Sequence, residues 1–436
     1  MESTIESSAQ SQKTYKITNG QKASILIVLM ILFIINYADR AILSVTLQNI
    51  KVSLGFSDTQ LGAIQTAFQI MVGAVTIPLG ILIDRWSRRK LAGIMALFWS
   101  VTTFLTGLCT NFISMLFVRA AVGLGEDGFT TIGSGWLSVA FSKSKRAMVN
   151  GIFGIGGTGG SALGMIVGGI IVTSTGMWQM PFFIFAIPGV IFGIWAFFLK
   201  DYKTPKKEGE SLLSKQYFRD WLALFKIKSY VFTLLGQMCF GVMLTTVIGW
   251  LPAFMMRAYD LNAAQAGGIV GSAALIGILG SLGGGFIADI WYRRQKGARI
   301  YLMTIAQLLF AILVGTVIYL MGSIPIPLMS VLLMVLMLVV GICGTLIYSL
   351  TMDVTPVSHR YSSYGIVVTA FFVVGSIGPS IVGAISDALG GGADGIRAGF
   401  LWLLPVTLLA VIFYGINWRY YPKESQLVSD TVLAEK

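Results

Sequence analysis

Twelve apolar runs, each about as long as a membrane-spanning helix, constrain this chain more than any other feature of its sequence. A helix needs about 20 mostly apolar residues to cross the hydrocarbon core of a bilayer. Charged residues make up only 11% of the chain, against about 25% in soluble proteins. The sequence therefore predicts an all-α membrane protein with twelve transmembrane helices. The runs lie near residues 24–46, 60–83, 91–109, 112–138, 147–173, 179–199, 230–255, 264–288, 298–321, 326–351, 362–386 and 397–418.

Polar segments divide these runs into two sets of six. We predict a tail over 1–23, a six-helix bundle over 24–199, a linker over 200–229, a second six-helix bundle over 230–418 and a tail over 419–436. The first tail lacks the charged segment, short apolar core and small-residue cleavage site of a signal peptide. The first helix is therefore expected to remain as an uncleaved span.

Lys and Arg lie almost entirely on one side of the predicted membrane. If the N-terminus is cytoplasmic, the tails and loops on that side hold 26 of the 31. The opposite side holds Lys51, Arg257 and Arg397, and two further cations, Arg40 and Arg119, lie inside spans. Because cytoplasmic loops carry the excess of Lys and Arg, both termini are expected in the cytoplasm, with the protein in the plasma or inner membrane. The net charge of +12 then reflects topology, and no nucleic-acid partner is expected.

Other function classes find little support in the residues. The three cysteines, Cys109, Cys239 and Cys343, are odd in number and show no metal-ligand spacing, so neither a disulfide framework nor a metal site is indicated. The lone His359 falls in a predicted cytoplasmic loop, which leaves no nucleophile-base centre, so an enzyme is not expected. No cofactor is expected, and without an ATP-binding loop the driving force must be a gradient.

Two loops on the predicted cytoplasmic side repeat one pattern, 205 residues apart. The segments Gly80–Lys90 and Gly285–Gln295 share Gly, Asp, Trp, Arg and Arg in register. The same offset maps Gln60 onto Gln265 at the preceding helix start. Six helices plus six, joined by a charged linker, are typical of a duplicated bundle whose parallel halves rock around a site near the midplane.

With these loops the chain resembles the major facilitator superfamily, whose loop signature is G-x-L-x-D-R-x-G-R-R/K. Ser87 stands where that signature has its second glycine. A further signature on the fourth helix, R-x-x-x-G-x-G, begins here at Arg119. Within the superfamily, Asn36–Arg40 and Gly123–Glu126 look like both the anion:cation symporters and the spinster-like transporters. The resemblance implies a two-bundle transporter that works by alternating access.

Five ionisable side chains lie inside predicted spans, where each costs several kcal/mol unless it faces a partner or water. Asp39 and Arg40 are expected at the depth of Glu126, because the first and fourth helices run in opposite directions. Arg40 and Arg119 can grip a carboxylate in bidentate fashion, and Asp39, Glu126 and Asp127 are candidates for proton coupling. The alternative is that Asp39–Arg119 or Arg40–Glu126 are buried ion pairs that only lock two helices together.

The predicted seventh and tenth helices hold no charged residue between Tyr230 and Arg257 or between Ile326 and Met352, so protonation is assigned to the N-terminal half. Polar and aromatic side chains there can orient a small solute. The candidates for substrate binding, besides the two arginines, are Asn36, Tyr37, Gln237, Trp250 and Tyr348. For each of the last three, interhelical packing or interfacial anchoring is the alternative.

The resemblance also implies that the aspartate of each repeated loop closes a cytoplasmic latch against a helix N-terminus and arginines. By this resemblance the role is assigned to Asp84, Arg85 and Arg88, and to Asp289 and Arg293 in the second loop, where Ile290 replaces the arginine that follows the aspartate. The alternative is that these cations serve only the orientation rule.

The predicted function is proton-coupled symport of a small organic anion, a carboxylate or a sugar acid, by a secondary active transporter. Sodium is the alternative coupling ion. The rival functions are a spinster-like carrier of a lysolipid or other amphiphile, a proton-coupled exporter, and a nontransporting sensor. The expected partners are the anion and the lipid bilayer, and the expected state is a monomer.

Overall fold

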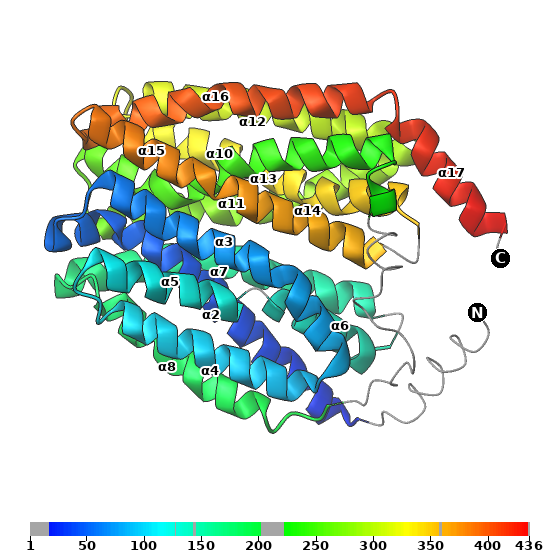
Figure 1. Cartoon of the computed structure of the whole chain (residues 1–436), viewed down its shortest axis with the longest axis horizontal. Helices are drawn as coiled ribbons and strands as arrows, with labels where there is room; N and C mark the ends of the chain where they lie inside the picture. The colour runs from blue at the N-terminus through cyan, green and yellow to red at the C-terminus, as the bar shows by residue number, and fades with distance from the viewer. Residues whose placement is uncertain (1–16, 127, 143–144, 202–221, 357–359, 435–436) are drawn as a thin grey trace.

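The computed structural model describes residues 17–126, 128–142, 145–201, 222–356 and 360–434, and these fold into helices without a strand (Figure 1). The N-terminal helices are α2 (Asn19–Leu54), α3 (Asp58–Arg85), α4 (Arg88–Thr106), α5 (Phe112–Glu126), α6 (Gly128–Ala140), α7 (Arg146–Thr175) and α8 (Met180–Ala196). The C-terminal helices are α10 (Lys228–Tyr259), α11 (Ala263–Arg294), α12 (Ala298–Leu320), α13 (Ile326–Val354), α14 (Arg360–Gly375), α15 (Ile377–Ala388), α16 (Gly392–Asn417) and α17 (Tyr421–Ala434).

The helices follow the apolar runs of the sequence. Each predicted run falls on one helix or on two successive helices. Among the described residues, eight helices are long and apolar enough to cross a membrane. The run at 112–138 is divided between α5 and α6, and the run at 362–386 between α14 and α15. The prediction of a helical membrane protein is confirmed, while the count of twelve spans stays a prediction.

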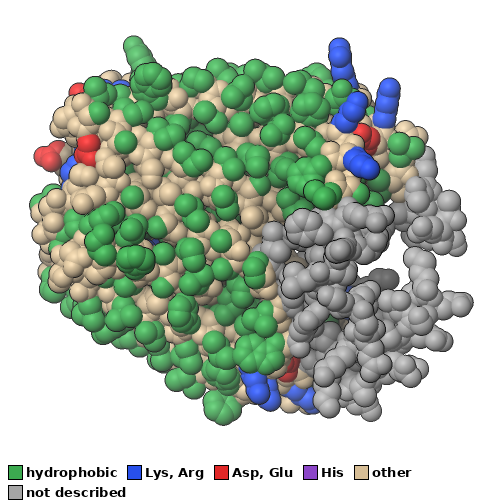
Figure 2. Space-filling view, viewed as in Figure 1, with side chains coloured by type: hydrophobic (Ala, Val, Ile, Leu, Met, Phe, Trp, Pro, Cys, Tyr) green, Lys and Arg blue, Asp and Glu red, His purple; other side chains and the backbone are tan. Residues whose placement is uncertain are grey.

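The N-terminal helices form the lower part of the molecule in Figure 1, and the C-terminal helices form the upper part. The two parts meet where α3 packs on α14 and α15, where α7 packs on α11, and where α2 packs on α10. We call the end where α2 begins and α17 lies the terminal end, and the opposite end the far end. On the face in Figure 2, hydrophobic side chains cover the middle and charged ones gather towards the two ends, as a bilayer requires.

Helices α3 and α11 begin with the same capping device. The Ser57 side chain accepts a hydrogen bond from the Gln60 backbone, and the Gln60 side chain accepts one from the Ser57 backbone. Asn262 and Gln265 form the equivalent box at the start of α11. Each box satisfies two backbone N–H groups that a helix start leaves without partners. The 205-residue repeat therefore has a structural counterpart at these two helix starts.

Glycine sets the spacing between the two sets of helices at the far end. A Cβ atom on Gly62 of α3 would lie 2.4 Å from the carbonyl oxygen of Pro379 on α15. A Cβ atom on Gly267 of α11 would lie 2.2 Å from the carbonyl oxygen of Met165 on α7. Small residues let helix backbones approach closely in membranes. These contacts bring the two parts together at matching positions of the repeat.

The break between α14 and α15 lies just before Pro379. Proline removes a helical hydrogen bond and releases a carbonyl group in the preceding turn. The Gly375 carbonyl accepts a hydrogen bond from Thr245 of α10 at 2.7 Å. The Ser376 carbonyl accepts one from Thr66 of α3. Threonines from both sets of helices therefore stabilise the break.

Candidate functional site

Four charged side chains from α2 and α5 meet in the middle of the N-terminal helices. Arg40 donates a hydrogen bond from Nε to Glu126 Oε2 at 2.8 Å. Arg119 Nη1 lies 3.5 Å from Asp39 Oδ2. Asp39, Arg119 and Glu126 are buried, whereas the Arg40 side chain keeps 16% of its surface exposed. Both ion pairs that the sequence offered as alternatives are therefore present at once.

Arg119 is the least satisfied of these four residues. Its side chain is completely buried, and none of its three guanidinium nitrogens makes a hydrogen bond within the described residues. The Glu126 Oε1 and Asp39 Oδ1 atoms are likewise buried and make no hydrogen bond within the described residues. A buried charge without hydrogen bonds costs several kcal/mol. The cluster therefore offers unused donors and acceptors at a depth where the protein has few charges.

Neighbouring side chains hold the cluster in place. Asn36 donates to the Glu126 backbone carbonyl at 3.2 Å, and Thr103 of α4 donates to Asp39 Oδ2 at 2.7 Å. The Arg40 guanidinium lies 4.9 Å from the Tyr37 ring centroid. Thr103 was not predicted, because a threonine in a predicted span carries no signal of its own. Asp127, a predicted proton-coupling residue, lies outside the described residues.

Helix α3 adds an aromatic ring and two amides that the sequence analysis missed. The Phe68 ring centroid lies 5.7 Å from the Arg40 guanidinium carbon and 5.2 Å from that of Arg119. Gln65 and Gln69, four residues apart and beside Phe68 on the helix, are buried, and each has a side-chain atom without a hydrogen bond among the described residues. Two glutamines at helical spacing in an apolar span are the signal that would have found this face.

The predicted binding residues of the C-terminal helices do not join the charged cluster as a group. Gln237 accepts a hydrogen bond from the Tyr414 hydroxyl at 3.3 Å. Trp250 is buried near the far end and donates to the Pro379 carbonyl at 3.1 Å. These contacts match the packing alternative. Tyr348 is 49% exposed, and its ring stands edge-on to Tyr364 with centroids 5.1 Å apart.

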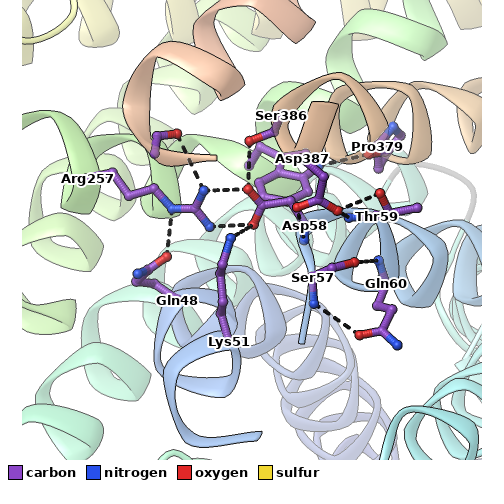
Figure 3. A network of polar contacts seen from close by, with 12 residues as sticks. Gln48, Lys51, Ser57, Asp58, Thr59, Gln60, Arg257, Pro379, Ser386 and Asp387 are labelled. Atoms are coloured by element: carbon purple, nitrogen blue, oxygen red, sulfur yellow. Dashed lines mark hydrogen bonds and ion pairs between the residues drawn. The ribbon is translucent and has the colours of Figure 1, made fainter. Parts of the chain in front are cut away.

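A second polar cluster, which we call the far-end cluster, joins the two sets of helices around Asp58 (Figure 3). Arg257 of α10 donates from Nη1 and Nη2 to the two Asp58 carboxylate oxygens, both at 2.7 Å. Lys51 of α2 and Ser386 of α15 also donate to this carboxylate, each at 2.6 Å. Arg257 Nε donates to Gln48 of α2 at 2.7 Å. From the sequence, Lys51 and Arg257 were recognised only as exceptions to the rule that Lys and Arg lie on the cytoplasmic side.

Asp387 of α15 completes the far-end cluster by capping α3 from the other set of helices. It accepts hydrogen bonds from the backbone N–H groups of Asp58 and Thr59 and from the Thr59 hydroxyl, at 2.9, 2.7 and 2.6 Å. A carboxylate at a helix N-terminus satisfies unpaired donors and complements the helix dipole. Both acids of the cluster thus hold the two sets of helices together.

The ionisation of Asp58 is fixed by the same contacts. Burial alone would raise its pKa, but hydrogen bonds from Arg257, Lys51 and Ser386 outweigh burial and lower the pKa from 3.8 to about 2. Because the pKa is lowered in the folded protein, this stabilisation is present above about pH 4 and is lost as pH falls towards 2. Between pH 5 and 8, Asp58 therefore stays ionised, and the far-end cluster is no pH sensor there.

The predicted latch residues lie at the terminal end. The side chains of Asp84 and Arg85 are outside the described part, and Arg88 is buried. Arg293 is exposed. Asp289 accepts from Arg299 at 2.8 Å, and the same arginine holds Asp353 through two hydrogen bonds. Among the described residues, no group of three or more His, Cys, Asp or Glu side chains is placed to hold a metal ion.

Comparison with known proteins gives a family-level match. The model of the Major Facilitator Superfamily matches residues 29–306. A hexuronate transporter from Bacillus subtilis is 25% identical over 85% of this chain and 89% of its own length. A probable L-galactonate transporter from Escherichia coli is 26% identical over 64% of each chain. A sphingosine-1-phosphate transporter from Xenopus tropicalis is 28% identical over 58% of this chain, and this chain spans half of that protein.

Among solved structures, the fold is similar to that of a bacterial homologue of the human lysosomal transporter Spinster. The two structures align with a TM-score of 0.80, at 18% sequence identity, over 94% of this chain and 99% of the other. That crystal structure is of an inward-facing, unoccupied conformation. At this identity the likeness establishes the fold alone.

Proposed function

The chain belongs to the major facilitator superfamily, and on that premise we propose that it is a secondary active transporter that carries a small organic anion together with protons. The observation that carries the proposal is the buried Arg119 guanidinium, which makes no hydrogen bond within the described residues, beside the Arg40–Glu126 pair. Arginine binds carboxylates through two parallel hydrogen bonds. A carboxylate or a sugar acid is therefore the proposed solute, and the likeness to a hexuronate transporter over most of the chain supports it.

Charge balance supplies the proposed coupling. The four described charges, Asp39, Arg40, Arg119 and Glu126, sum to zero when all are ionised. A monovalent anion entering this site would leave one buried negative charge in excess, which is costly. Protonation of Glu126 removes that excess and takes away the charge that Arg40 pairs with. One proton thus prepares the site for one negative charge on the solute.

The far-end cluster gives the proposed transporter its closed side. Helices α3 and α15 are joined there through Asp58 and Asp387, and α7 meets α11 through glycine. With both termini in the cytoplasm, as the distribution of Lys and Arg predicts, the far end faces outwards. The described arrangement is then closed to the outside, and uptake requires the far-end cluster to open.

Substitution of Glu126 tests the proposal. A Glu126→Gln variant keeps the size and shape of the side chain but cannot gain or lose a proton. We expect it to exchange labelled for unlabelled solute across liposomes at a rate near that of the wild type, and to lose accumulation driven by a pH gradient. Asp394→Asn, which neutralises an exposed acid at the far end, is the matched control and should keep both activities. Normal accumulation by Glu126→Gln would show that Glu126 is not the coupling acid.

A second candidate function is transport of a lysolipid or another amphiphile. It is favoured by the likeness to a sphingosine-1-phosphate transporter. The phosphate of such a solute is an anion that Arg40 and Arg119 can bind by the same chemistry. Competition tests whether the two kinds of solute share this site. A sugar acid and a lysolipid would each block uptake of the other only if both enter it.

A further inference from the structure

The donors around Asp58 form a complete receptor for a carboxylate. Four hydrogen bonds of 2.6 to 2.7 Å reach its two oxygens, and the acid is completely buried. Arg257 supplies a parallel pair of these bonds, the geometry with which arginine recognises planar carboxylates. The Asp58 side chain thus occupies the place that the carboxylate of a ligand could take.

The receptor is divided unequally between the two sets of helices. Arg257 on α10 and Ser386 on α15 belong to the C-terminal helices, whereas Asp58 itself and Lys51 belong to the N-terminal helices. If the two sets separate at the far end, Asp58 and Lys51 leave together as a pair. Arg257 and Ser386 remain behind without the carboxylate that they now bind.

Besides Gln48 of α2, the Arg257 guanidinium has two neighbours on its own side of the interface. Its guanidinium carbon lies 5.9 Å from the Trp250 ring centroid, and its Nη1 atom lies 3.5 Å from the Gly392 carbonyl. Gly390, Gly391 and Gly392 all have positive φ angles, between 75° and 83°, which glycine adopts without strain. This glycine loop lies close to the far-end cluster. The Trp250 and Gly392 contacts of the Arg257 guanidinium both come from the C-terminal helices.

Asp387 cannot replace Asp58 as the partner of Arg257 while α3 is in place. Its two carboxylate oxygens already accept from the Asp58 and Thr59 backbones and from the Thr59 hydroxyl. The third cation predicted on this side, Arg397, has its own acid, Asp394. When the two sets of helices part, Arg257 and Asp387 both lose their partners on α3, so an incoming carboxylate competes with Asp387 as well as with Asp58 for the Arg257 guanidinium.

We propose that Arg257 and Ser386 form an outer binding station for the carboxylate of the solute, which Asp58 fills whenever the far end is closed. The solute carboxylate and Asp58 compete for the same guanidinium. A bound anion thus holds the far end open, and its passage to Arg40 and Arg119 lets Asp58 return. This inference rests on the proposed function, because it requires the transported solute to carry a carboxylate.

Two substitutions separate a binding station from a simple gate. Arg257→Gln and Asp58→Asn each remove the same ion pair, so both should expose the far end to a similar degree. Exposure is measured without solute, by labelling a cysteine introduced at Ala263, which is buried in the far-end interface. Labelling of the native cysteines is subtracted as background. Arg397→Gln is the matched control, since it removes a far-end arginine outside the cluster.

The second readout is the KM for uptake of glucuronate from the far side of proteoliposomes, with glucose as a neutral competitor that should have no effect. We expect Arg257→Gln to raise the KM about tenfold or more, because charge-assisted hydrogen bonds are lost. Asp58→Asn should lower the KM or leave it unchanged, because the competing carboxylate is gone. Ser386→Ala should raise the KM by a smaller factor, and Arg397→Gln should match the wild type.

Equal shifts of the KM in the same direction for Arg257→Gln and Asp58→Asn would overturn the proposal, because Arg257 would then act only through the ion pair. If the wild type itself takes up no glucuronate or other carboxylate, the proposed function fails, and the binding station fails with it. If the wild type takes up a carboxylate but Arg257→Gln and Asp58→Asn shift the KM equally, only the binding station is ruled out and the proposed function stands.

Discussion

Arg119 differs from Arg257 and Arg299, two other arginines with largely buried side chains, in the hydrogen bonds that its guanidinium makes. Arg257 and Arg299 each make short hydrogen bonds to carboxylates. Arg119 has an acid only at 3.5 Å and no hydrogen bond among the described residues. Structural arginines are usually completed by their own protein, because a buried unsatisfied charge is costly. This contrast favours a ligand-binding role for Arg119 over a structural one.

A charge-neutral double substitution tests that role. If Arg119 and Asp39 only lock α5 to α2, the variant Asp39→Asn/Arg119→Gln should recover the transport lost in the Arg119→Gln variant. We expect the double variant to reach the membrane at wild-type levels but to bind the anion about ten- to a hundredfold more weakly, as lost charge-assisted hydrogen bonds imply. Direct binding of radiolabelled solute measures this. Asp394→Asn/Arg397→Gln, which removes an exposed pair, should bind normally. Recovery of binding by the Asp39 double variant would contradict the account.

The sequence predicted the charged part of the site but not its aromatic and amide part. Asp39, Arg40, Arg119 and Glu126 stand out because ionisable residues are rare in spans. Phe68 lies in an apolar run where most positions are hydrophobic, so its place between two guanidinium groups depends on helix packing. The far-end cluster was missed for a similar reason. The contacts by which it joins the two sets of helices link residues about 200 to 330 positions apart, and only the fold brings these residues together.

At the scale of helices, the approach of α3 to α15 depends on single glycines. A Cβ atom on Gly383 of α15 would lie 2.2 Å from the Asp58 carbonyl oxygen, nearer than van der Waals contact allows. The backbone there belongs to the first turn of α3, which Asp387 caps. Closure at the far end therefore requires both the charges of the cluster and the absence of a side chain at this position.

A Gly383→Val variant should open the far end. The added isopropyl group, whose Cβ alone would clash with the Asp58 carbonyl oxygen, would force α15 away from α3 and lengthen the hydrogen bonds around Asp58. We expect labelling of a cysteine at Ala263 by a membrane-impermeant maleimide to rise severalfold in this background. Gly268→Val on α11 is the control, because a Cβ atom there meets nothing within 4 Å. Equal labelling in the two valine variants would mean that the α3–α15 contact does not keep the far end closed.

Most of the helices could be predicted from the sequence. Apolar runs of the right length predicted the positions of the helices, whereas the break that divides the run at 362–386 into α14 and α15 was found only in the structure. Helix α17 was not predicted, because its polar sequence carries no apolar run. Contacts keep it in place: Glu424 accepts from the backbone N–H of Ser229 at 2.9 Å, and Tyr421 donates to Asp353.

The whole molecule has its two clusters at different levels. The N-terminal helices carry the buried acids and arginines in their middle. The far-end cluster joins the N-terminal helices to the C-terminal helices. In the proposed cycle, a change of protonation at Glu126 occurs in the middle of the solute's path, and exchange of partners at Arg257 occurs at its far end. Rigid helices with two discrete packings can link such events.

Proton movement coupled to an anion is the central claim, and the pH of weakly buffered proteoliposomes tests it most directly. A panel of sugar acids, dicarboxylates, aromatic acids and lysolipids would be added in turn while the bath pH is recorded. The account predicts that the bath becomes alkaline on addition of at least one carboxylate, because protons enter with it, and that Glu126→Gln abolishes the change. An unchanged bath pH for every acid, with a response only to lysolipids, would contradict it.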